Sequence, residues 1–186
     1  MRRFVSWPRA TWLRLGLLTT VVGALTLLGA CNPALNWREV RFDGLATCVL
    51  LPCKPDRAER TVQLGEARAT LRMMGCEAQD LQFTWSQLDL PVGPVPTQIV
   101  RAWQQASLLA LGADPALATQ VRQLVLTGAR MDVSPSQLAA AAPVGPQAHF
   151  YWWLHAGQAY QLAVYSNRNA VPASVLQTLQ EGIQLP

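Results

Sequence analysis

After residue 30 the chain lacks an excess of basic charge, and this absence excludes one large class of partner. Of its fifteen lysine and arginine residues, four precede residue 31, whereas none of the eleven acidic residues does. The segment from residue 31 onward therefore carries eleven basic and eleven acidic side chains. Because nucleic-acid binding needs a clustered basic surface that displaces counterions from phosphates, no nucleic-acid partner is expected.

The sequence also lacks the short motifs of catalysis. It contains no CxxC pair, no GxSxG nucleophile motif and no glycine-rich phosphate loop. The only two histidines, His149 and His155, lie in one expected strand. Six residues of strand span about 20 Å, which one metal ion cannot bridge. No cofactor, metal site or catalytic residue is therefore predicted. The alternative is a hydrolase whose site is assembled from distant residues.

The chain does have an N-terminal segment with the three parts of a secretory signal. Four arginines lie before residue 15, an apolar stretch runs over residues 15–28, and the small residues Gly29 and Ala30 come next. Such a segment directs export and is then removed. The alternative is an uncleaved membrane helix over about residues 12–30. Its uncharged part, residues 15–30, is shorter than the roughly 20 residues that a membrane span requires.

The sequence Leu28-Gly29-Ala30-Cys31 resembles the lipobox of bacterial lipoproteins, in which an aliphatic residue and two small residues precede a cysteine. The resemblance implies cleavage before Cys31, attachment of diacylglycerol to its thiol and acylation of the new amino terminus. Asn32, where many lipoproteins of the inner membrane have aspartate, implies an outer-membrane location with the domain facing the periplasm. Membrane lipid is thus an expected partner through acylated Cys31, because two or more acyl chains hold a protein stably.

The expected organisation is a signal peptide over residues 1–30, a tether over 31–36 and one domain over 37–186. In that domain, apolar residues alternate where strands are expected and recur every three or four residues where helices are expected. The expected strands cover residues 37–42, 46–51, 61–64, 67–76, 81–86, 149–155 and 159–166. Helices are expected at 97–111, 115–126 and 172–181, a charged loop at 52–60, and a helical turn at 136–140 within irregular chain.

The order of strands, helix, strands and helix predicts an α+β domain, with helices packed on the faces of an antiparallel sheet. This order, with the sequence Gly157-Gln158-Ala159-Tyr160-Gln161-Leu162 entering a late strand and a closing amphipathic helix, is similar to the PsbP-like α/β/α sandwich of many small bacterial lipoproteins. The resemblance spans about residues 37–185. It rests on pattern, so it implies a fold and carries over no functional residue.

Export to an oxidising periplasm favours disulfide formation among the three cysteines that remain after lipidation. Cys48 and Cys53 are separated by about 16 Å if the chain between them is extended, which is too far for a disulfide. We predict that Cys53 pairs with Cys76, because both lie where a strand ends and the chain direction can adjust. Cys48 is then a buried free thiol; its pairing with Cys76 is the alternative.

Large rings occupy both faces of the strand that contains Phe150-Tyr151-Trp152-Trp153. Phe150 and Trp152 are expected in the core, and Tyr151 and Trp153 on the opposite face. If a helix covers that face, the latter two are core residues as well. If it is open, they form a candidate surface for an envelope protein or an apolar ligand. The resulting hypothesis is a non-catalytic lipoprotein that binds a ligand or assists assembly.

Replacing Cys31 with alanine is expected to abolish metabolic labelling of the protein with radioactive palmitate, because the thiol that receives the lipid is lost. The wild-type chain, labelled and immunoprecipitated in parallel, is the control. Labelling that persists in the C31A variant would contradict the lipoprotein hypothesis, and a wild-type chain that takes up no label would favour the uncleaved membrane helix.

Overall fold

The computed structural model describes residues 35–65, 67–90, 95–126, 133–168 and 170–185. All of these residues belong to one compact unit of the chain. The predicted leader, its alternative membrane helix and Cys31 lie outside the described residues. Among the helices within them, none combines the length and the apolar character that crossing a membrane requires.

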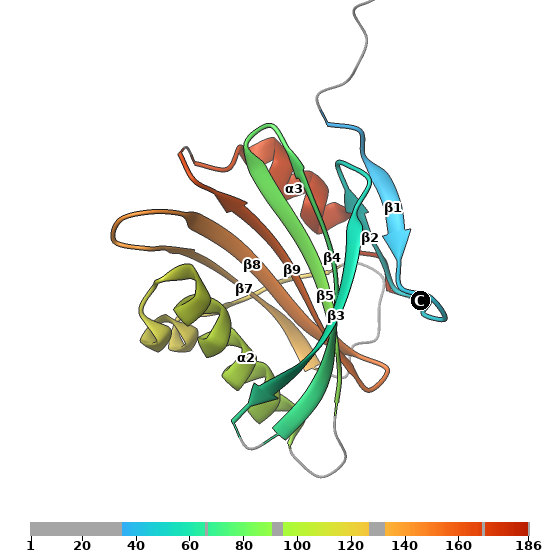
Figure 1. Ribbon diagram of the computed structural model, residues 1–186, viewed down its shortest axis with the longest axis vertical. Helices are drawn as coiled ribbons and strands as arrows, with labels where there is room; N and C mark the ends of the chain where they lie inside the picture. Colours follow the sequence, from blue (N-terminus) through green and yellow to red (C-terminus); the bar gives the residue numbers. More distant parts are fainter. Residues whose placement is uncertain (1–34, 66, 91–94, 127–132, 169, 186) are drawn as a thin grey trace, which may run out of the picture. The chain divides into compact units, whose positions relative to one another are not determined.

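A sheet of seven antiparallel strands forms the centre of this domain (Figure 1). Its order is β3-β4-β5-β9-β8-β7-β6, so two meanders meet along β5 and β9. The strands are β3 (Asp56–Leu64), β4 (Ala67–Ala78), β5 (Leu81–Asp89), β6 (Arg122–Gln123), β7 (Val133–Ala141), β8 (Gln147–His155) and β9 (Gln158–Ser166).

Both faces of the sheet are covered. Helix α2 (Pro96–Leu111) and the short 3-10 helix η2 (Pro115–Thr119) pack on one face, which we call the helix face. The hairpin of β1 (Arg38–Arg41) and β2 (Cys48–Leu51), together with helix α3 (Ala173–Glu181), packs on the other, the hairpin face. The domain agrees with the predicted α+β class, and it contains more sheet than the sequence pattern indicated.

Strand β8 is apolar on both sides because each of its faces meets a separate core. Phe150 and Trp152 belong to the cluster on the helix face, whereas Tyr151 and Trp153 belong to the cluster on the hairpin face. Tyr151 is 3% exposed and Trp153 2% exposed. The ring of Trp153 stacks on Tyr160 with the ring centroids 5.4 Å apart. The candidate surface at Tyr151 and Trp153 is therefore not open, and the covered alternative holds.

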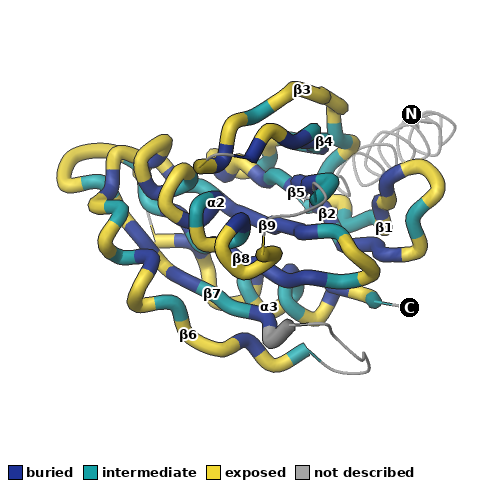
Figure 2. The backbone as a smooth tube through the Cα atoms, turned by 90° about the horizontal axis from the view of Figure 1, so that it is seen from below, coloured by how far each residue is buried: buried dark blue, intermediate teal, exposed yellow. Residues whose placement is uncertain are grey.

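The charged loop expected over residues 52–60 is present only over residues 52–55, because strand β3 begins at Asp56. This strand forms the edge of the sheet and pairs only with β4, from Asp56 opposite Gly75 to Leu64 opposite Ala67. Most of its side chains are exposed, as the yellow tube in Figure 2 shows. An edge strand exposed on both faces has no alternating pattern, and charged side chains protect it from pairing with other chains.

The helical turn expected at residues 136–140 is also wrong, because β7 is a strand there. It pairs with the ring-bearing part of β8, with Ser136 opposite Trp152 and Leu138 opposite Phe150. Alanine has little intrinsic preference for strands, so pairing with β8 decides the conformation. The local sequence could not reveal this long-range pairing.

The second helix, expected over residues 115–126, ends early as the 3-10 helix η2. Its start is as predicted: the Asp114 carboxylate accepts a hydrogen bond from the backbone N–H of Ala116 at 2.8 Å. Beyond Thr119 the chain joins the sheet instead, and the N–H of Leu124 donates to the carbonyl of Pro135 at 2.8 Å. Pairing with β7 thus replaces the helical hydrogen bonds.

The predicted disulfide between Cys53 and Cys76 is present in the structure, with Cα atoms 5.9 Å apart. It joins the segment that comes after β2 to the inner strand β4. Cys48 is a buried free thiol, as predicted, and burial raises its pKa. The bridge closes a long loop, which is the condition under which a disulfide restricts the unfolded chain most.

Replacing both Cys53 and Cys76 with serine is expected to lower the free energy of unfolding by about 3 kcal/mol, from the loop-closure entropy that the unfolded chain regains. Urea unfolding followed by tryptophan fluorescence measures this difference. Cys48→Ala is the matched control, since it removes a buried thiol and leaves the bridge intact. A double variant no less stable than this control would contradict a structural role for the bridge.

Candidate functional site

A groove of about 410 Å³ lies on the helix face, between α2 and strands β3, β4, β5 and β9. It exists because α2 contacts β3 and β8 while leaving part of the face between them uncovered. A volume of this size is within the range of pockets that hold small molecules. Its lining residues are Arg60, Val62, Gln63, Leu64, Leu71, Met73, Thr84, Ser86, Trp103, Ala106, Ser107, Ala110, Gln161 and Tyr165.

The floor of the groove is polar, although it belongs to the middle of the sheet. Ser86 on β5 lies directly opposite Gln161 on β9. Ser86 is only 3% exposed and Gln161 5% exposed. Two polar side chains thus lie more than nine-tenths buried at the base of the groove. Burying a polar group without a hydrogen-bond partner costs about 1–3 kcal/mol, so their partners are informative.

The partners of Gln161 determine which of its atoms is left for a ligand. The hydroxyl of Ser107 on α2 donates to the backbone carbonyl of Trp103 at 2.9 Å. Because that proton is used, the Ser107 oxygen accepts from Nε2 of Gln161, at 2.7 Å. This fixes the orientation of the amide. The Oε1 atom of Gln161 is then an acceptor that receives no hydrogen bond from the described residues.

Ser86 adds a second available group to the floor. Its hydroxyl makes no hydrogen bond to any residue in the described ranges. A serine hydroxyl is both a donor and an acceptor, and it can rotate toward a ligand. Ser86 and Gln161 therefore present one hydroxyl and one carbonyl oxygen side by side at the base of the groove.

Tyr165 and Thr84 extend the floor and are paired with each other. Burial raises the pKa of Tyr165, and a hydrogen bond with Thr84 opposes that effect in part. The phenol therefore stays neutral around pH 7. Its ring packs edge-on against Phe150, with centroids 5.7 Å apart, so it is held by the core beside the groove.

The walls of the groove are mainly apolar, and the one charged side chain in the described lining, Arg60, is positive. Leu71 and Met73 of β4 form one side, and Trp103 and Ala106 of α2 form the other. Arg60 is exposed and has no ion-pair partner among the described residues. Among the described residues, the lining contains no acidic side chain. Such a site suits a ligand that is largely apolar and is neutral or negatively charged.

The residues that helix α2 packs against the sheet differ from those that the spacing of its apolar residues predicts. Ala106 and Ala110 continue the apolar spacing that begins at Ile99 and Trp103, yet both alanines are exposed and line the groove. The residues of α2 that are buried are Ile99, Trp103, Gln104, Leu108 and Leu111. The small alanine side chains leave room beside the sheet where larger ones would fill the groove.

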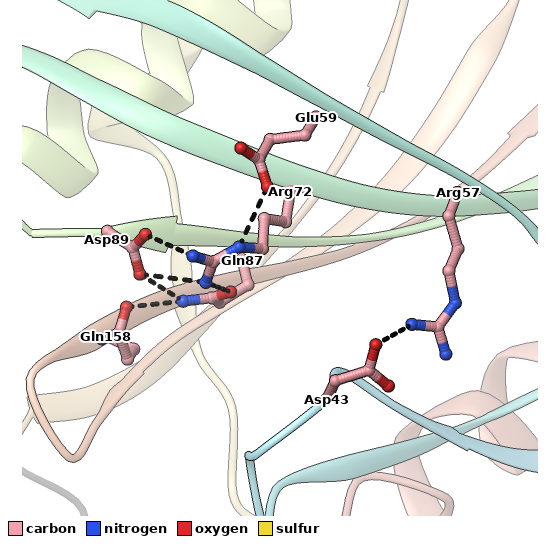
Figure 3. Close-up of polar contacts among 7 residues, drawn as sticks. All are labelled: Asp43, Arg57, Glu59, Arg72, Gln87, Asp89 and Gln158. Atoms are coloured by element: carbon pink, nitrogen blue, oxygen red, sulfur yellow. Dashed lines mark hydrogen bonds and ion pairs between the residues drawn. The ribbon is translucent and has the colours of Figure 1, made fainter.

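A second polar cluster lies on the side of β4 that faces away from the groove, and its charged groups pair with one another (Figure 3). Arg72 forms ion pairs with Glu59 at 3.2 Å and Asp89 at 3.1 Å, and it also donates to Gln87. Nearby, Arg57 pairs with Asp43 at 3.0 Å. Four of these charged groups, Asp43, Arg57, Glu59 and Arg72, line a hollow of about 350 Å³ with Phe42. Because every charge there already has a partner, the cluster is better explained as support for the sheet.

The structure does not bring the predicted site residues together. Cys31 lies outside the described residues, the disulfide cysteines lie away from the groove lining, and Tyr151 and Trp153 are in the hairpin-face core. Burial lowers the pKa of His149. Within the described ranges, no three side chains of the metal-binding types are grouped to hold an ion.

The sequence did not predict the groove, although the alternating residues of one expected strand indicated which side chains face it. The strand containing Leu81, Phe83 and Trp85 places Thr84 and Ser86 on the opposite face. In a sheet covered on one side, those residues would face solvent. Here both faces are covered, so the same alternation puts a hydroxyl into the interior.

Comparison with protein-family models, with curated proteins and with solved structures finds no match to the chain.

Proposed function

We propose that this chain is a lipid-anchored binding protein of the bacterial cell envelope, with its ligand in the groove beside α2. Its anchor is acylated Cys31 in the outer membrane, and its domain faces the periplasm. The lipobox-like sequence Leu28-Gly29-Ala30-Cys31 supports this part. The disulfide between Cys53 and Cys76 is consistent with an oxidising compartment.

The observation that carries the binding function is the unpaired Oε1 atom of the buried Gln161 side chain, at the base of the groove. A site with mostly apolar walls and a few fixed polar groups is typical of small-molecule binding. Within the described lining, no histidine, cysteine or carboxylate accompanies the hydroxyl of Ser86 to act as a base. This supports a non-catalytic role over a hydrolase.

A PsbP-like sandwich is the finer fold that we propose. Its support is an antiparallel sheet with a helix on each face, α2 on one side and α3 on the other. The hairpin of β1 and β2 adds to the α3 side. The groove itself depends only on α2 and the sheet, so the binding function does not rest on this assignment.

Filling the groove is expected to remove the binding of a neutral apolar probe. The Ala106→Trp variant places an indole in the groove, since Ala106 is an exposed lining residue of α2. We expect it to bind 2-naphthol about tenfold more weakly than the wild type does. Calorimetric titration of the full chain in lipid nanodiscs measures the affinity, with empty nanodiscs subtracting partition of the probe into lipid.

Leu109→Trp is the matched control, because Leu109 lies on the same helix, is 62% exposed and does not line the groove. It should bind 2-naphthol as the wild type does. Equal affinities in the wild type and the Ala106→Trp variant, or no binding to the wild type, would overturn the proposed site.

A further inference from the structure

The groove places one acceptor, one hydroxyl and one cation in a defined arrangement. Building on the binding function proposed above, we propose that the ligand is an anionic amphiphile with a hydrogen-bond donor on its apolar body. The body lies between α2 and β4, the donor meets Gln161 and Ser86 on the floor, and the acidic group lies near Arg60. A fatty acid of medium length with a hydroxyl at the far end of its chain, such as 8-hydroxyoctanoate, is one molecule with this chemistry.

The requirement for a donor comes from the hydrogen bonds that fix the Gln161 amide. Its Nε2 atom is engaged by Ser107, whose own proton is directed at the carbonyl of Trp103. The second N–H of Nε2 and the carbonyl oxygen remain, and of these the carbonyl oxygen can only accept. A ligand that offers an ether or a bare hydrocarbon at this point leaves Oε1 unpaired. Discrimination against a ligand that lacks the matching polar group is stronger than discrimination by hydrophobic size.

The requirement for an apolar body comes from the walls. Leu71, Met73 and Trp103 present hydrocarbon and ring surface on the two sides of the floor. Methionine adapts to flexible chains because its side chain is unbranched. Ala106 and Ala110 leave space along α2 in which a chain can lie. A sugar, which is polar over most of its surface, would bury hydroxyl groups against these apolar side chains.

The requirement for an acidic group comes from the charges. Arg60 is the single charged side chain among the lining residues that the structure describes, and the described residues give it no ion-pair partner. Because Arg60 is exposed, solvent screens its attraction, and its contribution is expected to be modest. Its position on the edge strand β3 places it at the side of the groove away from Gln161 on β9. A cationic ligand would find no acidic partner in this described part of the lining.

The direct test compares three probes on the full chain in lipid nanodiscs: 8-hydroxyoctanoate, 8-methoxyoctanoate and octanoate. The methoxy probe keeps the oxygen and removes the donor. We expect 8-hydroxyoctanoate to bind about tenfold more tightly than either of the others, the size of one net hydrogen bond. Calorimetric titration measures the three affinities, with empty nanodiscs as the blank. Three equal affinities would overturn the proposed donor.

Two variants, each compared with a control substitution outside the groove, show which residues determine the probe affinities. Gln161→Met removes the acceptor and should reduce the preference for the hydroxylated probe to less than about twofold, whereas Gln82→Met, on the same sheet outside the groove, should leave it unchanged. Arg60→Gln should weaken all three probes by a similar factor of about three, whereas Arg101→Gln should not.

The outcomes separate this inference from the binding function. A preference that persists in Gln161→Met, or probe affinities that Arg60→Gln leaves unchanged, would overturn the ligand class. The groove itself would still stand if 2-naphthol binding is lost in Ala106→Trp. If the Gln161→Met variant fails to fold, the comparison of hydroxy and methoxy probes on the wild type decides the donor, because it needs no substitution.

Discussion

The domain depends on one constraint: its central sheet must be covered on both faces. The rings of Trp85 and Trp153 require the hairpin of β1 and β2 with α3, and those of Phe150 and Trp152 require α2. Burying such rings removes about 150–250 Å² each from water, which makes them the main source of stability. The hairpin and the helices are thus explained by the sheet, and the disulfide then fixes the segment after β2 onto β4.

The same constraint produces the groove. Helix α2 is held to the sheet by Trp103 and Leu108, and by the hydrogen bond between Ser107 and Gln161. Ala106 and Ala110 are too small to close the space beside it. The hydrogen bond that joins helix to sheet also leaves the Gln161 carbonyl oxygen available to the groove. Structure and proposed binding chemistry therefore share one contact.

Residues with a strong local signal were predicted well. The strand around Phe83 alternates between apolar and polar residues, and the strand around Tyr151 is apolar on both faces. The apolar residues that recur from Ile99 onward indicate helix α2. The pairing of Cys53 with Cys76 was predicted from the ends of strands. The conformation of β3 and β7 could not be predicted, because an exposed edge and an alanine-rich strand carry no periodic signal and are set by their neighbours β4 and β8.

The groove also depends on long-range pairing that the local sequence does not reveal. Ser86 and Gln161 are ordinary polar residues in the sequence, and only the register of β5 against β9 brings them together under α2. The motif that the sequence does contain concerns Cys31, so it bears on where the chain is held and leaves open what it binds.

Photochemical labelling of the full chain with 8-hydroxyoctanoate carrying a diazirine in the middle of its chain tests the central claim most directly. We predict that mass spectrometry finds the label on α2 between Trp103 and Ala110 or on β4 near Met73, and that unlabelled 8-hydroxyoctanoate suppresses it. Label concentrated on the β1–β2 hairpin or on α3, with none beside α2, would contradict it.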